Sequence, residues 1–171
     1  ALDRGGYLHD IGKIGIPDRV LLKPGPLEPS ELALMRTHPR RGHDILAKVL
    51  DETSSAVAEA VLRHHEGFDG SGYPGRLKGE QIPLLSRIIA IADAFDAMTG
   101  GRADRPPLDR MTALAELARY AGSQFDPMLV KEFAVVAEGT TGEIDLDLVA
   151  DLLATTQNGS ESAAPSARRF V

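Results

Sequence analysis

Hydrophobic residues recur along most of the chain at intervals of three and four, the spacing that gathers them on one face of an α-helix. The clearest stripe follows Pro83 and comprises Leu85, Ile88, Ile89, Ala92 and Phe95. Comparable stripes begin at residues that suit the first turn of a helix, namely Pro29, Pro39, Ser54 or Ser55, Asp109 and Pro127. The pattern predicts an all-α fold, a bundle of helices.

Each of the other predicted helices has an apolar face that we expect to be buried. In chain order these faces comprise Leu32 and Met35; Ile45, Leu46 and Val49; Val57, Ala60 and Val61; Leu114 and Leu117; and Leu129, Phe133 and Val136. Proline disfavours helical geometry in the residue before it, so Pro39 places His38 at a helix end.

The periodic signal weakens beyond Gly139, and we expect one domain over residues 1–138. Residues 139–171 are predicted to form a weakly structured tail, in which an apolar run favours one short helix at 145–154. From Thr155 onward the chain is polar and rich in small residues, a composition typical of disorder.

Composition narrows the class of protein. At 171 residues, 43% hydrophobic and 26% charged, the chain resembles an ordinary soluble domain. Its net charge of -6 argues against a nucleic-acid polymer as partner, because a phosphate backbone requires a basic face. No stretch approaches the length of a membrane span. The absence of cysteine fits the cytoplasm and leaves only nitrogen and oxygen ligands for a metal.

Histidines and aspartates form the most distinctive pattern in the chain. The set comprises His9, Asp10, His38, His64, His65 and Asp93. The intervals from Asp10 to His38, from His38 to His64 and from His65 to Asp93 are 28, 26 and 28 residues, each close to a helix plus a connection. Several helices could therefore point one ligand each toward a common centre. Imidazole and carboxylate groups bind zinc and first-row transition metals.

Each member of the set also has a simpler interpretation. The His9 and Asp10 pair could be structural, His38 could cap a turn, and His64 and His65 could be cations favoured by the helix dipole. Asp93 is harder to explain in this way, because a carboxylate beside isoleucines is costly unless it is neutralised or binds a cation. The combination favours a metal site. His43 fits no part of the pattern and is expected at the surface.

Two motifs resemble those of a known family. The sequence His9-Asp10-Ile11-Gly12-Lys13 is similar to the HDxGK signature of the HD-superfamily metal-dependent phosphohydrolases. His64-His65-Glu66, followed by Asp69 to Pro74, resembles the HHExxDGxGYP signature of the HD-GYP subgroup, and the similarity extends from about Leu8 to Val136. The resemblance implies a helical bundle of the HD-domain type with two or three divalent ions at its core, iron or manganese. Such domains hydrolyse cyclic di-GMP to pGpG and sometimes to GMP.

The resemblance also implies a role for each residue. Asp10 would bridge two ions, with His9 and Asp93 as ligands of one ion and His38, His64 and His65 as ligands of the other. Lys13 would act with Asp10 in catalysis by placing an ammonium near the scissile phosphate, where negative charge develops. Arg102 and Arg105 match positions that hold substrate phosphates. Their simpler interpretation, like that of Lys13, is a solvated surface side chain.

The loop of Gly72, Tyr73 and Pro74 is open to two interpretations. It could line the substrate cleft, where the Tyr73 ring would stack on guanine, or it could dock a diguanylate cyclase domain. A plain structural loop is the simpler alternative. The runner-up function is accordingly a non-hydrolysing sensor of the dinucleotide or a docking module, and the third is a hydrolase for other nucleotides.

The chain departs from the family pattern in two places. Family members have a further metal-binding histidine on an upstream helix, whereas this chain starts eight residues before His9. We therefore expect a domain that lacks its first helix, cut from a longer protein with an upstream sensory or receiver domain. Asp104 lies between Arg102 and Arg105, where relatives have an aromatic residue, which puts substrate affinity in doubt. The oligomeric state stays open, with a homodimer among the options.

Overall fold

The computed structural model describes residues 2–49, 55–100 and 106–138, and all the regular structure within these ranges is helical. The predicted all-α fold is confirmed. The α-helices are α1 (Leu2–Leu8), α2 (Asp18–Leu21), α3 (Pro29–Met35), α4 (His38–Val49), α5 (Ser55–Arg63), α6 (Leu84–Thr99), α7 (Arg110–Arg119) and α8 (Pro127–Glu138). Two short 3-10 helices, η1 (Ile11–Gly15) and η3 (Gly79–Gln81), connect them. The predicted tail, with its helix at 145–154, lies outside the described residues.

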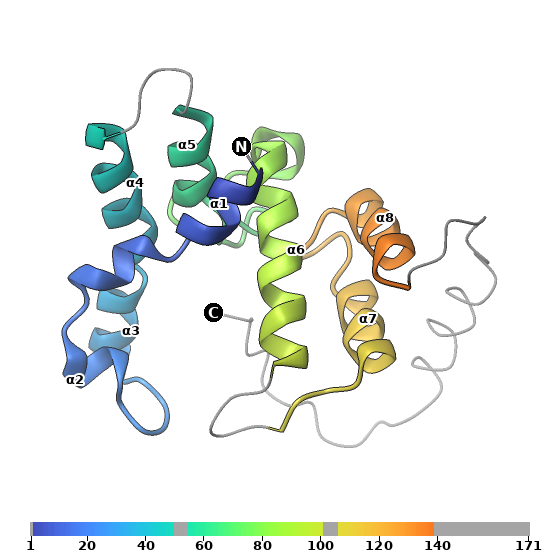
Figure 1. Ribbon diagram of the computed structural model, residues 1–171, viewed down its shortest axis with the longest axis horizontal. Helices are drawn as coiled ribbons and strands as arrows, with labels where there is room; N and C mark the ends of the chain where they lie inside the picture. The colour runs from blue at the N-terminus through green and yellow to red at the C-terminus, as the bar shows by residue number, and fades with distance from the viewer. Residues whose placement is uncertain (1, 50–54, 101–105, 139–171) are drawn as a thin grey trace.

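Helix α6 is the central element of the bundle. It contacts α1 and α5 on one side and α7 and α8 on the other, and it stands between these two groups in Figure 1. Because neighbours cover it from two directions, its buried apolar residues include Ile89, Ile91 and Met98 instead of one narrow stripe. The prediction that Ala92 belongs to the buried face is wrong, since Ala92 is exposed.

Two apolar clusters stabilise the two halves. The first joins α6, α7 and α8 through residues such as Met98, Leu117 and Phe125. The second joins α4 and α5 through Leu46 and Val61. Each fully buried large side chain contributes about 1.5–3 kcal/mol to folding, so both clusters hold their helices firmly in place.

Several other predicted core positions are wrong. Val49 and Val136 are 71% and 78% exposed, Ile45 is 36% exposed, and Leu32 and Met35 are only half-buried. Helix α4 packs on one side only, against α5 and η1, so its flanking apolar positions face outward. Helix α3 has seven residues and packs mainly on the four-residue α2, which is too short to cover its apolar face.

The helix starts predicted at Pro29, Asp109 and Pro127 are confirmed, whereas α4 begins at His38, one residue before the predicted start. Pro29 opens α3, where Glu28 and Glu31 form a reciprocal capping box. The carboxylate of Asp109 accepts a hydrogen bond of 3.0 Å from the Thr112 N–H at the start of α7. Pro127 opens α8. None of the described helices combines the length and apolar character needed to cross a bilayer.

Candidate metal centre

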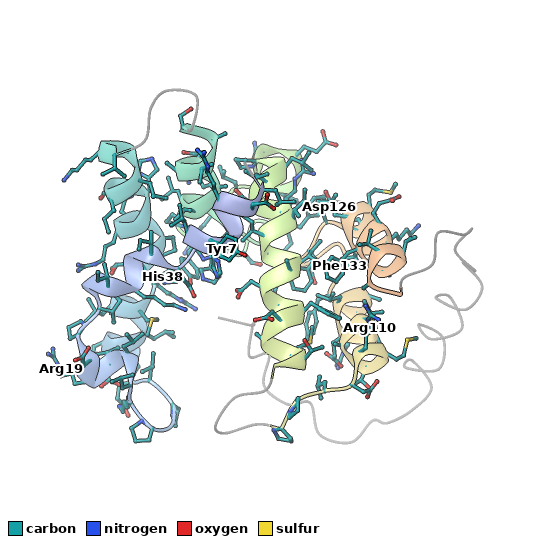
Figure 2. The ribbon with its side chains drawn as sticks, viewed as in Figure 1. Tyr7, Arg19, His38, Arg110, Asp126 and Phe133 are labelled. Atoms are coloured by element: carbon teal, nitrogen blue, oxygen red, sulfur yellow. The ribbon has the colours of Figure 1, made fainter. Side chains whose placement is uncertain are left out.

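The histidines of the predicted site lie at helix ends. His9 follows α1, His64 and His65 follow α5, and His38 opens α4, beside the segment that follows α1 (Figure 2). Asp10 directly precedes η1, and Asp93 lies in the middle of α6. Side chains that are far apart in the sequence therefore converge where α1, α4, α5 and α6 meet.

Three of these histidines form a compact cluster. The Nε2 atom of His38 lies 3.3 Å from Nε2 of His64 and 3.2 Å from Nε2 of His65. Ligand atoms of all three lie within 4.8 Å of one another. Burial lowers the pKa of each ring, to about 4 for His64, so the imidazoles are neutral near pH 7. Neutral imidazole is the form that binds metals.

The protonated nitrogens of the rings are held by the backbone. Nδ1 of His9 donates to the carbonyl of Gly6 at 2.6 Å, and Nδ1 of His64 donates to the carbonyl of Val61 at 2.6 Å. Nδ1 of His38 donates in the same way to the carbonyl of residue 35, at 2.8 Å. In the neutral rings of His38 and His64, a proton on Nδ1 leaves Nε2 with its lone pair toward the cluster, and such support is typical of metal-binding histidines.

Asp10 connects the histidine cluster to a second group of ligands. Its Oδ1 lies 3.3 Å from Nε2 of His38, whereas its Oδ2 lies 3.4 Å from Nε2 of His9. Nε2 of His9 also lies 3.6 Å from Oδ1 of Asp93. The two oxygens of Asp10 thus face different groups, the arrangement that a bridging carboxylate requires.

In the second group, formed by His9, Asp10 and Asp93, the pKa of the histidine is raised instead of lowered. Burial alone would lower the pKa of His9, but its hydrogen bonds with Asp10 and Asp93 outweigh burial and raise the pKa to about 10. Burial would raise the pKa of both aspartates, but the contacts with His9, and with Lys13 for Asp10, lower it. The Lys13 ammonium lies 2.5 Å from Oδ2 of Asp10. Without a metal, His9 and Lys13 therefore balance the negative charge of the aspartates.

A glycine allows Asp10 to reach the histidines. At Gly12, a Cβ atom would lie 1.9 Å from the carbonyl oxygen of His38 and 2.5 Å from the amide nitrogen of Gly42. Only glycine allows η1 to approach α4 this closely. Gly42 plays a similar part on α4, where a Cβ would lie 2.8 Å from the Val61 side chain.

The Gly-Tyr-Pro loop packs directly on the histidine cluster. The Tyr73 ring stacks on the His65 ring, with 5.0 Å between centroids and 24° between planes. The Tyr73 N–H donates to the His65 carbonyl at 3.1 Å, and the peptide bond to Pro74 is cis. Burial raises the pKa of Tyr73, so its hydroxyl keeps its proton. That hydroxyl is buried and has no hydrogen-bond partner within the described ranges.

Glu66 anchors the loop, a role that sequence reasoning missed. Its side chain has no exposed surface and accepts hydrogen bonds from the N–H groups of Gly75 at 2.6 Å and Leu77 at 3.0 Å. Arg63 lies 3.4 Å from the same carboxylate. The only sequence signal was its place after two histidines in the motif. The contacts show that Glu66 orients the loop.

A pocket of about 140 Å³ adjoins the cluster. Its lining includes His64, His65, Gly72, Tyr73 and Asp93, so the pocket joins the loop to the ligands. A larger hollow of about 710 Å³ between α1, α6 and α8 also reaches His9 and Asp93, and its walls are mainly apolar.

The structure brings together all six residues of the predicted ligand set, with Lys13 and Tyr73 beside them. Pro74 belongs to the loop but not to the pocket lining. Arg102 and Arg105 lie outside the described residues. His43 stays apart from the cluster and lies 3.2 Å from Asp44.

The donor set suits a metal. Three neutral imidazoles whose Nε2 atoms converge cannot satisfy one another by hydrogen bonds alone, and neighbouring carboxylates supply negative charge. Nitrogen and oxygen ligands of this kind fit first-row transition metals.

Comparison with known proteins places the chain in a family. A model of the HD domain matches residues 1–129, and the chain belongs to this HD domain family. The expected resemblance to HD-GYP-type phosphohydrolases is confirmed by close relatives. A cyclic di-GMP phosphodiesterase of Vibrio cholerae is 46% identical over 142 residues, which are 80% of this chain and 29% of the relative. The cyclic di-GMP phosphodiesterase response regulator RpfG of Xanthomonas campestris is 48% identical over 129 residues, 75% of this chain and 34% of the relative.

A third relative, a cyclic di-GMP phosphodiesterase of Thermotoga maritima, is 41% identical over 155 residues, 91% of this chain and 41% of the relative. The chain thus spans less than half the length of these relatives. A solved structure of a cyclic GMP-AMP specific phosphodiesterase from Vibrio cholerae superposes with a TM-score of 0.57 at 22% identity, over 88% of this chain and 42% of that one. This likeness confirms the fold.

Proposed function

We propose that this chain is the catalytic domain of a metal-dependent phosphodiesterase that hydrolyses cyclic di-GMP to pGpG, with GMP as the alternative end product. The observation that carries the proposal is the division of Asp10 between two ligand groups, with Oδ1 toward His38 and Oδ2 toward His9. One carboxylate between two sets of donors suits a centre of two ions. Relatives at 41–48% identity are named cyclic di-GMP phosphodiesterases, which supports the substrate.

We assign His38, His64 and His65 to one ion and His9 and Asp93 to the other, with Asp10 shared between them. Iron or manganese is the expected metal, because imidazole and carboxylate ligands together suit both. These residues would hold divalent ions, and the chemistry supplied there would be Lewis acidity toward a phosphate oxygen and toward water.

The chain's own residues orient the reactants. The carbonyl contacts at Nδ1 fix the direction of the histidine rings, so the ligands need little rearrangement. Lys13 is held at the centre by Asp10 and lies where its ammonium can stabilise charge on the scissile phosphate. The buried Tyr73 hydroxyl can donate a hydrogen bond to a phosphate oxygen in the adjoining pocket. Arg102 and Arg105 stay predicted phosphate-binding residues.

Turnover of defined dinucleotides tests the proposal. Protein loaded anaerobically with Fe²⁺ or Mn²⁺ is expected to convert cyclic di-GMP to pGpG, as followed by chromatography with metal analysis. His65→Ala should lose metal and turnover together, whereas His43→Ala, which removes a histidine outside the cluster, should lose neither. Metal-loaded protein that binds cyclic di-GMP without cleaving it would identify the runner-up, a non-hydrolysing sensor or docking module.

Cyclic GMP-AMP is the second candidate substrate. A relative 43% identical over 124 residues is named a 3'3'-cGAMP-specific phosphodiesterase, although the chain covers only 24% of it. The same assay run with 3'3'-cGAMP separates the two candidates by their kcat/KM values.

Four further features stay predictions. They are the cytoplasmic location, the upstream sensory or receiver domain, the docking of a diguanylate cyclase at Gly72 to Pro74, and a homodimer.

A further inference from the structure

Two arginines in the pocket beside the histidine cluster have no role in the assignments above. Arg36 and Arg76 both line the 140 Å³ pocket together with His64, His65 and Tyr73. They come from different elements, Arg36 from the end of α3 and Arg76 from the loop after Pro74. Both residues are exposed, so their charges are accessible from solvent.

Neither arginine is neutralised by a carboxylate in the part of the chain that the structure describes. Ion pairs there occupy Arg63 with Glu59 and Glu66, and Arg87 with Asp126. No ion pair or side-chain hydrogen bond there includes Arg36 or Arg76. The acids of the same pocket are already engaged, because Glu66 accepts from the loop backbone and Asp93 contacts His9. The pocket therefore presents two unpaired cations.

The guanidinium of Arg36 is held in place by an aromatic ring. Its Cζ lies 5.2 Å from the centroid of Tyr73, a cation–π contact, while the same ring stacks on His65. This contact leaves the N–H donors in the plane of the guanidinium available to an anion. With His65 and Arg36 both over the Tyr73 ring, the predicted stacking of Tyr73 on guanine has little of the ring left to use.

Arg76 occupies an unusual backbone conformation. Its φ of 54° makes it the one residue other than glycine with a positive φ within the described ranges. The neighbouring Gly75 cannot carry a side chain, because a Cβ there would lie 2.2 Å from Nη1 of Arg63. A long side chain in the left-handed region is unfavourable, and such outliers persist where function requires them.

We propose that Arg36 and Arg76 form a clamp for the second phosphodiester of a cyclic dinucleotide, the one that is not being hydrolysed. The inference rests on the proposed function. A cyclic dinucleotide carries two phosphodiesters, and while one is at the metal ligands the other must be placed nearby. Guanidinium groups bind phosphate oxygens through paired N–H donors. The clamp adds a specific reason for this acidic chain to bind a dianionic substrate.

Two substitutions test the clamp without endangering the fold. Arg36→Ala removes an exposed side chain, and Arg76→Gly removes the charge while placing at positive φ the residue that prefers it. Arg40→Ala is the matched control, since Arg40 is an exposed arginine of α4 outside the pocket lining. All variants are compared as metal-loaded 171-residue chains, with metal content and melting temperature measured in parallel.

The kinetic constants are compared between cyclic di-GMP, which has two phosphodiesters, and bis(p-nitrophenyl) phosphate, which has one. For Arg36→Ala and Arg76→Gly, we expect KM for cyclic di-GMP to rise about tenfold. A change of this size corresponds to the loss of one charge-assisted hydrogen bond. The ratio of kcat/KM for cyclic di-GMP to that for bis(p-nitrophenyl) phosphate should fall by the same factor. The loss of affinity for cyclic di-AMP, measured by equilibrium dialysis, should match that for cyclic di-GMP, because the phosphates are common to both.

If the unsubstituted protein cleaves cyclic di-GMP, three results would overturn the clamp. Variants that match Arg40→Ala in KM would show that the arginines do not bind substrate, although the proposed function would stand. An equal loss with bis(p-nitrophenyl) phosphate would place the arginines at the scissile phosphate. A loss limited to cyclic di-GMP would show that they read guanine instead of phosphate. If the unsubstituted protein failed to cleave cyclic di-GMP, the proposed function itself would fall, and the clamp with it.

Discussion

Oδ1 of Asp10 lies 3.3 Å from Nε2 of His38, a residue 28 positions further along the chain. This contact joins the group around His9 to the buried histidine cluster. Asp10→Ala should therefore remove metal from both positions, because the loss of a shared carboxylate leaves two cations poorly screened. Metal analysis after gel filtration measures the effect. Full metal content and turnover in this variant would contradict the shared role, and Asp44→Ala, at an exposed aspartate of α4, is the control.

Lys13 is expected to act on the chemical step. Lys13→Ala should lower kcat for cyclic di-GMP roughly a hundredfold, because its ammonium faces developing charge at the transition state. KM should change little. Steady-state kinetics with equal metal loading separate the two parameters, and Lys48→Ala provides an exposed lysine outside the site. A rise in KM with unchanged kcat would make Lys13 a binding residue only.

Glu66 should affect both stability and substrate binding. Glu66→Gln weakens two hydrogen bonds to the loop backbone, and we expect the free energy of unfolding to fall by about 2 kcal/mol. The displaced loop should also raise KM, because Tyr73 and Arg76 lose their positions. Glu59→Gln, at the exposed partner of the same arginine, should change stability by less than about 0.5 kcal/mol. Urea unfolding of both variants decides whether the buried carboxylate holds the loop.

Gly12 is tightly packed, whereas Gly6 has open space beside it, so alanine substitutions at the two positions should have opposite effects on stability. Gly12→Ala forces a Cβ against the backbone of α4 and should lower the free energy of unfolding by more than about 3 kcal/mol. A Cβ at Gly6, inside α1, meets nothing within 4 Å, so Gly6→Ala should stabilise the protein by up to about 1 kcal/mol. Equal effects of the two substitutions in chemical denaturation would refute the close approach of η1 to α4.

The metal-free protein should be most stable near neutral pH. The folded pKa of His64 is about 4, below its ordinary 6.5, so its stabilisation is complete above pH 6.5 and is lost as the pH falls toward 4. The folded pKa of His9 is about 10, so its stabilisation is complete below pH 6.5 and is lost as the pH rises toward 10.

Each of these histidines changes the free energy of unfolding by up to about 1.4 kcal/mol per pH unit. Urea titrations in a chelating buffer between pH 5 and 9 should thus show a maximum near pH 6.5. His9→Gln should remove the decline on the alkaline side. A profile that rises steadily to pH 9 in the unsubstituted protein would contradict the raised pKa of His9.

Local signals in the sequence predicted most helix starts, because proline at Pro29 and Pro127 and the cap at Asp109 act within one turn. Exposure was harder to predict. Val49 and Val136 follow the helical spacing, yet none of the described helices covers them, and neighbours are set by tertiary packing. Periodicity describes one helix at a time, so it cannot show which side of that helix stays open.

In the candidate site, too, features carried by a local motif could be predicted, whereas contacts between distant segments could not. The ligand set could be predicted because residue type, spacing and motif agree on it. The anchoring by Glu66 and the contact between Arg36 and Tyr73 could not, because they join segments that only the folded loop brings together. Arg36 and Tyr73 are 37 positions apart, and no periodic pattern relates them.

The carbonyls that hold Nδ1 of His9, His38 and His64 all lie three residues earlier, in the last turn of α1, α3 and α5. Carbonyls in a last turn have no partner inside their own helix, so each helix end supplies an acceptor at no cost to its own hydrogen bonds. Each of these three rings is thereby oriented by the end of the helix that precedes it in the chain. Loss of one of these three rings by substitution should consequently leave the other two pointing in their present directions.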